Sequence, residues 1–164
     1  MLRARTHRWI EAGLDSVAAP GLAYALYRGG ERLELTLDAE GRQASFDLPV
    51  ATLDATLVMK ALLVAEGTRH QLDRLVTDTA DAAMLAVSVA RSPEAVDAIS
   101  ENRGRREVRR ALRWLGEAFT DQRSAAARRV QRHFEQEYER DDGSAWAVEH
   151  VAGLLDAVGG RRRA

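Results

Sequence analysis

From Val50 almost to the end of the chain, apolar residues recur only at helical spacing, and this pattern most limits the possible folds. It is interrupted at Gly67, at Ser92-Pro93, where a serine N-cap precedes a proline in the first helical position, and at the polar residues 141–144. The first segment is apolar almost all round, which predicts a central core helix. Helices are predicted at about 51–66, 72–89, 93–100, 105–119, 123–140 and 145–158. They number five rather than six if the fourth and fifth join.

The first fifty residues show a different pattern. Helical spacing predicts a helix over about 3–17, and an apolar run at 22–28 then leads into a two-glycine turn. Apolar and polar residues alternate over 33–37 and again over 44–48, which is typical of strands. These runs predict a three-stranded antiparallel meander. Helices would cover one of its faces, because an isolated ribbon is only marginally stable in water.

The predicted fold is therefore α+β and predominantly helical, with an N-terminal helix, the three-stranded antiparallel meander and a bundle of about five to six helices. A length of 164 residues suits a single domain. We assign this domain to residues 1–160, with the helix and meander in 1–49 and the helical region in 50–160, followed by a basic tail at 161–164. Hydrophobic residues at 46% and charged residues at 30% are typical of a globular protein and exclude a disordered chain.

Several catalytic and ligand-binding motifs are absent from the sequence, which limits the reactions and cofactors to be expected. The chain has no cysteine, which excludes disulfides, thiolate nucleophiles and cysteine-ligated metals, and it has neither a phosphate-binding glycine motif nor a GxSxG elbow. Ser144 is better explained as a helix cap than as a nucleophile. His133 and Glu137 stand four residues apart, but no second pair at metal-ligand spacing accompanies them. The sequence thus predicts no catalytic residue, no cofactor and no metal.

The N-terminal residues lack the apolar stretch of a signal peptide, so a cytoplasmic location is expected. The longest strongly apolar segment, 57–65, is interrupted by Lys60 and is shorter than the roughly 20 residues that span a bilayer. No membrane span is predicted.

The net charge of -1 hides a segregated distribution of charge. Residues 9–102 carry a net charge of -8 and residues 135–156 one of -6, whereas residues 103–134 hold ten arginines against three acids, a net charge of +7. Residues 1–8 and the tail carry +3 each. Such a concentration of positive charge predicts an anionic partner for residues 103–134.

Within this basic block, residues 105–119 predict an amphipathic helix whose apolar stripe packs and whose opposite face presents arginines. Like charges on adjacent turns repel each other. Phosphates would offset this repulsion, because a guanidinium group binds them through a planar fork and each contact releases counterions. The candidate nucleic-acid-binding residues are Arg103, Arg105, Arg106, Arg109, Arg110 and Arg113.

The segment 92–119 also resembles a helix-turn-helix, with a short first helix, a turn and a basic second helix. In that motif the second helix enters the major groove and its N-terminal residues meet base edges. The resemblance implies base contacts by Arg105, Arg106 and Arg109, and phosphate contacts by Arg103 and Arg113.

The sequence therefore predicts a non-enzymatic protein that binds DNA or RNA, such as a helix-turn-helix-like regulator or accessory factor. The alternative is a protein-interaction subunit of a larger assembly, of the phage, secretion or defence type, whose basic patch meets an acidic protein surface. Basic and acidic patches on one chain would also suit a homo-oligomer. In a further arrangement the arginines pair with acids of residues 9–102 or 135–142 of the same chain.

Overall fold

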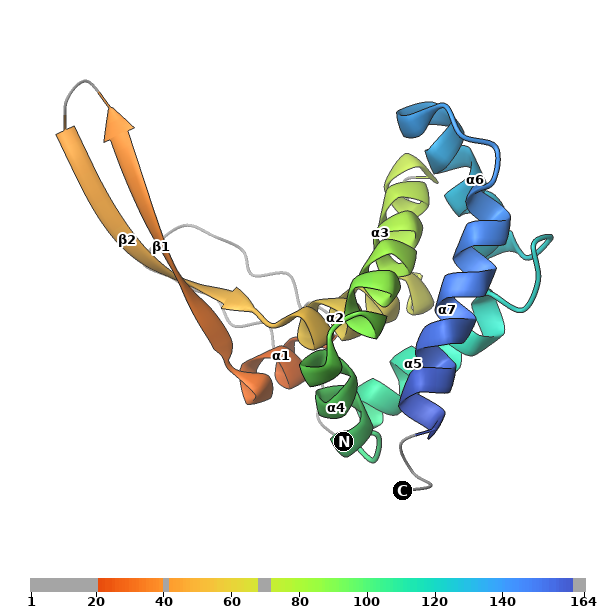
Figure 1. Ribbon diagram of the computed structural model, residues 1–164, viewed down its shortest axis with the longest axis horizontal. Helices are drawn as coiled ribbons and strands as arrows, with labels where there is room; N and C mark the ends of the chain where they lie inside the picture. Colours follow the sequence, from red (N-terminus) through yellow and green to blue (C-terminus); the bar gives the residue numbers. More distant parts are fainter. Residues whose placement is uncertain (1–20, 40–41, 68–71, 161–164) are drawn as a thin grey trace.

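The computed structural model of the chain describes residues 21–39, 42–67 and 72–160 (Figure 1). The helix predicted at 3–17 and the basic tail at 161–164 lie outside the described residues. The elements in chain order are α1 (Leu22–Arg28), β1 (Gly30–Ala39), β2 (Arg42–Ala51), α2 (Leu53–Ala65), α3 (Leu72–Ala90), α4 (Pro93–Glu101), α5 (Arg106–Ala118), α6 (Ala125–Tyr138) and α7 (Gly143–Gly160).

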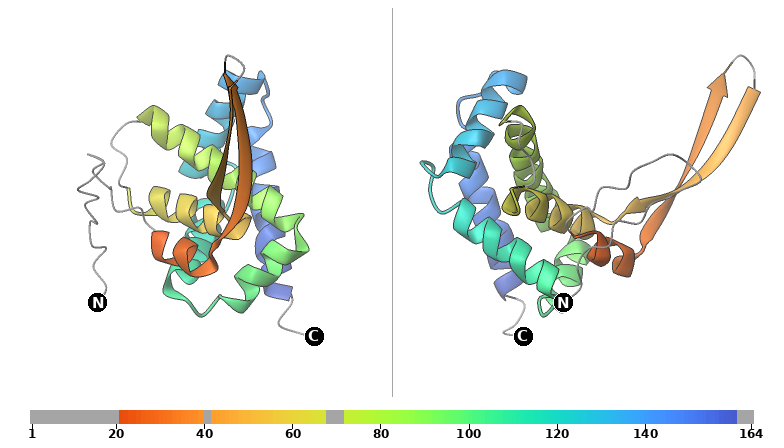
Figure 2. Two further views of the ribbon diagram at one scale, coloured as in Figure 1. Left: turned by 90° about the vertical axis from the view of Figure 1, so that its left-hand side faces the viewer. Right: turned by 180° about the vertical axis from the view of Figure 1, so that it is seen from behind.

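Helices α2 to α7 form a helical bundle, as the periodicity predicts (Figures 1 and 2). α2 is central, since it packs against α1, α3, α4 and α5, while α3 also packs against α6 and α7. α5 and α6 are separate helices, so six helices follow the ribbon in the described part of the chain. The side chains at the centre of the bundle are fully buried, among them Leu57, Leu62, Ile99, Leu115 and Leu154.

Of the two predicted serine caps, the one at Ser92 is confirmed and the one at Ser144 is wrong. The Ser92 hydroxyl accepts a hydrogen bond from the backbone N–H of Ala95 at 3.2 Å, which confirms the predicted start of α4. The prediction that Ser144 caps the last helix is wrong, because α7 already begins at Gly143. Instead, Oε1 of Gln131 on α6 accepts the backbone N–H of Ser144 at 3.0 Å. A side chain from a neighbouring helix therefore satisfies the first turn of α7.

The predicted three-stranded meander is wrong, because residues 22–28 form the helix α1. In a strand, Tyr24 and Ala25 would point to opposite faces, whereas in a helix both are buried against the bundle. Gly21 and Gly29 flank the helix with φ values of 81° and 72°, a left-handed region that favours glycine. As a helix, the run buries Tyr24 and Ala25 together, while Leu22, Leu26 and Tyr27 stay exposed.

The remaining β structure is a two-stranded antiparallel ribbon of β1 and β2, with register from Gly30 opposite Ala51 to Ala39 opposite Arg42. Pro49 stands opposite Arg32, and a ribbon tolerates it because both strands are edges. Figures 1 and 2 show the ribbon extending away from the helices. The predicted α+β packing, in which helices cover a sheet, is therefore also wrong.

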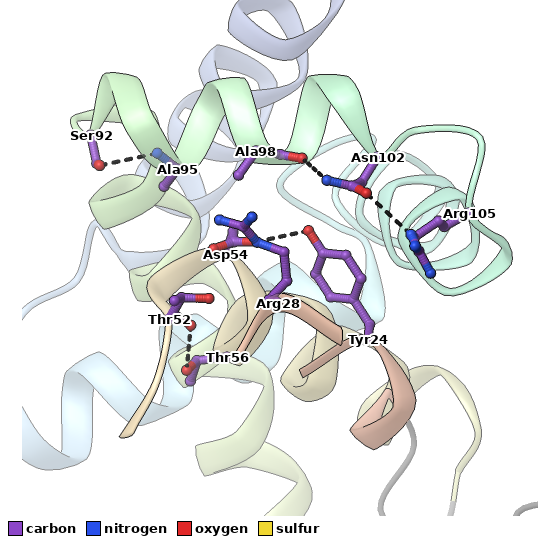
Figure 3. A network of polar contacts seen from close by, with 10 residues as sticks. All are labelled: Tyr24, Arg28, Thr52, Asp54, Thr56, Ser92, Ala95, Ala98, Asn102 and Arg105. Carbon is purple, nitrogen blue, oxygen red and sulfur yellow. Dashed lines mark hydrogen bonds and ion pairs between the residues drawn. The ribbon is translucent and has the colours of Figure 1, made fainter. Parts of the chain in front are cut away.

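A polar cluster joins α1 to α2 at the base of the ribbon (Figure 3). The Tyr24 hydroxyl donates to Asp54 Oδ2 at 2.7 Å, and Nε of Arg28 donates to the same oxygen at 2.8 Å. Burial alone would raise the pKa of Asp54, but these hydrogen bonds outweigh it and hold the pKa below its usual value. Since α1 precedes β1 and α2 follows β2, the cluster ties together both ends of the ribbon.

Lys60, the only lysine of the chain, joins α2 to α3. Its Nζ donates to Asp78 Oδ1 and to Asp81 Oδ2, both at 2.7 Å. Partial burial would lower the pKa of Lys60, but hydrogen bonds to the two carboxylates outweigh this effect and raise it. The ammonium group therefore stays charged between the two helices.

We expect Asp54→Ala to lower the free energy of unfolding by about 3 kcal/mol at neutral pH, because Tyr24 and Arg28 lose their shared acceptor. The folded-state pKa of Asp54 is lowered, so its contribution is present above the unfolded pKa, about 3.9, and is lost as pH falls through the folded value. Urea unfolding of both proteins should show a difference that shrinks below about pH 4. A difference that stays constant down to about pH 3 would contradict this account.

We expect Gly143→Ala to lower the free energy of unfolding by about 1 to 3 kcal/mol, because the added Cβ overpacks the contact between α6 and α7. It would lie 2.9 Å from Phe134 Cβ and 3.0 Å from Gln131 Cα. The matched control is Gly153→Ala, where a Cβ meets nothing within 4 Å. This change should stabilise α7 by about 0.5 to 1 kcal/mol. Thermal unfolding of the two variants should shift in opposite directions, and equal shifts would rule out the tight contact at Gly143.

Candidate nucleic-acid interface

The amphipathic character predicted for α5 is confirmed. Val108, Ala111 and Leu115 are buried, and Phe119 at the end of the helix is buried with them. Trp114 is half-buried, and its ring and that of Phe119 pack in a T-shaped arrangement with their centres 5.9 Å apart. The opposite face consists of exposed residues. The buried stripe therefore anchors α5 in the bundle, and the opposite face is open to solvent.

Arg105 is exposed, but it is held in place by two contacts. Its guanidinium carbon lies 3.2 Å from the centre of the Tyr27 ring. Its Nε donates to Asn102 Oδ1 at 3.1 Å, a hydrogen bond that Figure 3 shows. Asn102 in turn donates to the carbonyl of Ala98 at 2.8 Å. The side chain of Arg105 thus connects the start of α5 to α1 and to the end of α4.

Arg110 and Arg103 also have partners in the chain. Nη1 of Arg110 lies 3.0 Å from Oε1 of Glu66, so this arginine pairs with the end of α2. Nη1 of Arg103 donates to the carbonyl of Val158 at 3.2 Å, near the end of α7. Both contacts tie neighbouring helices together.

Arg106, Arg109 and Arg113 differ from the other candidates. All three are exposed, and none forms a hydrogen bond or ion pair with any residue that the structure describes. They lie on adjacent turns of α5, opposite the buried stripe. The structure therefore divides the six predicted residues into three that hold α5 in place and three that stand free of the described chain.

The pairing of these arginines with acids of the same chain is found only in part. Glu66 takes Arg110, as pairing with residues 9–102 predicts. The acidic residues 135–142 lie where α6 ends, at the opposite end of the bundle from the start of α5 (Figure 1). Asp142 there pairs with Arg140, whose hydrogen bonds lower the pKa of the carboxyl. Pairing within the described chain therefore does not account for the exposed face of α5.

The packing of α4 and α5 differs from that of a helix-turn-helix. α4 packs mainly against α7, α3 and α2, and α5 packs mainly against α2 and α7. The two helices therefore pack on shared neighbours more than on each other. The resemblance in sequence reflects two successive helices separated by a polar turn.

A surface pocket of about 300 Å³ lies where α5 meets the end of α7. The residues that line it are Arg103, Arg109, Leu112, Arg113, Leu155 and Val158. Sequence reasoning found the three arginines from their density in the chain. It missed the part played by the aliphatic residues, because nothing in the local sequence reveals that α7 ends beside α5.

The residues considered for a metal have other surroundings. In the part of the chain that is described, no group of three or more histidine, aspartate or glutamate side chains could hold a metal ion. The ring of His133 is buried, and it packs in a T-shaped arrangement with the ring of Tyr138, their centres 5.9 Å apart. Glu137, in contrast, is exposed. His150 stacks on Trp146 with ring centres 4.8 Å apart. These histidines belong to an aromatic cluster at the interface of α6 and α7.

Comparison with protein-family models, with curated proteins and with solved structures found no match. No helix within the described ranges is long and apolar enough to cross a membrane. An assignment of function therefore depends on the geometry and charge of the residues above.

We expect the triple α5 variant (Arg106→Gln, Arg109→Gln and Arg113→Gln) to keep its free energy of unfolding within about 0.5 kcal/mol of the parent protein, because no described contact is lost. Arg105→Gln should cost about 1 kcal/mol, since it loses the Tyr27 ring and the bond to Asn102. Urea unfolding of both variants checks this difference. A triple variant that is less stable than Arg105→Gln would show that the three arginines have structural partners.

Proposed function

We propose that the protein is a non-enzymatic nucleic-acid-binding protein, acting in the cytoplasm, whose contact surface is the exposed face of α5. The proposal depends on the exposure of Arg106, Arg109 and Arg113 and on their lack of an ion-pair partner among the described residues. They are exposed on one helix face, and no carboxylate in the described chain neutralises them. A surface of this kind suits a polyanion better than a neutral or basic partner.

The spacing of these arginines supports a phosphate backbone as the ligand. Arg106 and Arg113 are seven residues apart, which corresponds to about 10 Å along the helix axis. One strand of duplex DNA carries a phosphate about every 3.4 Å along its axis, so about three phosphates fall within the same length. Three guanidinium groups along this length allow up to about three phosphate contacts.

The other three candidates have supporting roles in this proposal. Arg105 and Arg110 are exposed enough to add to the positive field of α5 while Tyr27 and Glu66 hold them. Arg103 connects the turn before α5 to α7. A helix held at its start and along its length can present its free arginines in a fixed arrangement.

An assembly subunit is the second candidate function, and the shape of the molecule favours it. The ribbon extends away from the bundle, although two-stranded ribbons are marginal when isolated in water (Figure 1). The acidic residues 135–142 and the start of α5 lie at opposite ends of the bundle. Copies of the chain, or an acidic protein partner, could therefore meet α5 by charge complementarity.

The dependence of binding on salt tests the preferred function. We expect the protein to bind mixed-sequence duplex DNA, and the triple α5 variant to bind it more weakly at every salt concentration. Each phosphate contact contributes about 0.9 to the magnitude of the slope of log affinity against log salt concentration. Because the variant lacks three contacts, its slope should be smaller in magnitude by about 3. Fluorescence anisotropy at several salt concentrations measures both quantities.

A matched control separates the α5 surface from net charge. Arg74→Gln on α3, Arg91→Gln in the turn after α3 and Arg128→Gln on α6 together remove the same charge from exposed positions outside α5. This control should keep most of the affinity and slope of the parent protein. Equal losses in the two triple variants would reject α5 as the contact surface, and no binding of DNA or RNA at low salt would favour the assembly subunit.

A further inference from the structure

The pocket between α5 and the end of α7 combines two kinds of chemistry. Arg103, Arg109 and Arg113 supply three positive charges, and no acidic residue lines the pocket. The remaining lining residues, Leu112, Leu155 and Val158, are aliphatic. A flat basic surface for a polyanion does not need an apolar wall of this kind, so the pocket suits a ligand that is itself part anion and part apolar.

The three arginines of the pocket come from two parts of the chain, α5 and the turn before it. Arg109 and Arg113 stand four residues apart on α5, which places them on the same side of adjacent turns. Arg103 comes from the turn before α5, where its single described hydrogen bond ties it to the carbonyl of Val158. A guanidinium group has five N–H donors, so this bond leaves others for a ligand.

We infer that this pocket binds a small phosphate monoester that carries an apolar body. A phosphate monoester has a charge of about -1.5 to -2 at neutral pH and three strong acceptor oxygens. It therefore matches three guanidinium groups better than a carboxylate, whose single charge leaves more of the positive charge unbalanced. The aliphatic wall gives the rest of the molecule a surface to pack on.

The size of the pocket limits the ligand. A volume of about 300 Å³ lies at the lower end of the range for small-molecule sites. It holds a phosphate with one ring or a short aliphatic chain. The inference does not depend on the proposed nucleic-acid function, because it requires a single phosphate group together with an apolar body.

Phenyl phosphate is the probe that tests this site, with inorganic phosphate and phenol as its two halves. We expect saturable binding of phenyl phosphate in isothermal titration calorimetry, at least about tenfold tighter than that of either half. Arg109→Gln and Arg113→Gln should each weaken it about tenfold, since each removes hydrogen bonds to a charged group. Thermal unfolding checks that the variants remain folded.

Arg106→Gln is the matched control, because it removes the same charge from the same helix outside the pocket. It should change the affinity for phenyl phosphate by less than about twofold. Three results would each overturn the inference: no saturable binding of phenyl phosphate, equal affinity for inorganic phosphate, or equal weakening by Arg106→Gln.

Oligonucleotides distinguish two sources of the phosphate monoester. If a 5′-phosphorylated single strand displaces phenyl phosphate better than its 5′-hydroxyl counterpart, the ligand is the end of a nucleic acid. If neither strand displaces it, the pocket takes a free small molecule, and equal displacement by both strands would overturn the inference, because the 5′-hydroxyl strand carries no phosphate monoester. The first two results require the saturable binding above and identify the natural source.

Discussion

Burial of the apolar stripe of α5 determines how this helix faces solvent. A buried Val or Leu side chain contributes about 1.5 to 3 kcal/mol, and Val108 and Leu115 are fully buried in the bundle. Repulsion between arginines on adjacent turns costs only a few tenths of a kcal/mol per pair, roughly. The core therefore decides the orientation. Helical geometry then leaves Arg106 and Arg113 on the solvent side.

The arginines with partners stabilise this arrangement through contacts that reach three other helices. Arg105 reaches α1 through Tyr27, Arg110 reaches the end of α2 through Glu66, and Arg103 reaches the end of α7. An exposed ion pair such as that of Arg110 contributes at most about 1 kcal/mol, so these contacts define position more than they add stability. The remaining arginines cost the fold little, which leaves them available for a ligand.

The sequence predicts the helices after Val50 well, because each has a continuous apolar stripe and clear interruptions such as Ser92-Pro93. It fails at residues 22–28, because seven residues are too few to separate a buried helix from a buried strand by periodicity. That error changed the predicted α+β fold, since the meander lost a strand and the ribbon lost its cover of helices.

For the candidate site, the sequence identifies the arginines of α5 but not which of them have partners in the chain. Charge density locates Arg106 and Arg110 equally well, yet only Arg110 meets a carboxylate. Glu66 is 44 residues away along the chain, so only the packing of α2 on α5 reveals the pair. The same holds for Leu155, which joins the basic pocket through the position of α7.

The most direct measurement is the rate at which each arginine reacts with phenylglyoxal, read by mass spectrometry with and without nucleic acid. The account predicts that Arg106, Arg109 and Arg113 react faster in the free protein than Arg103, Arg105 and Arg110, which have partners, and that bound DNA or RNA protects these three more than the exposed Arg74 and Arg128. Slow reaction of these three in the free protein would show that the chain itself covers them. Fast reaction without protection in a complex would place the nucleic acid on another surface.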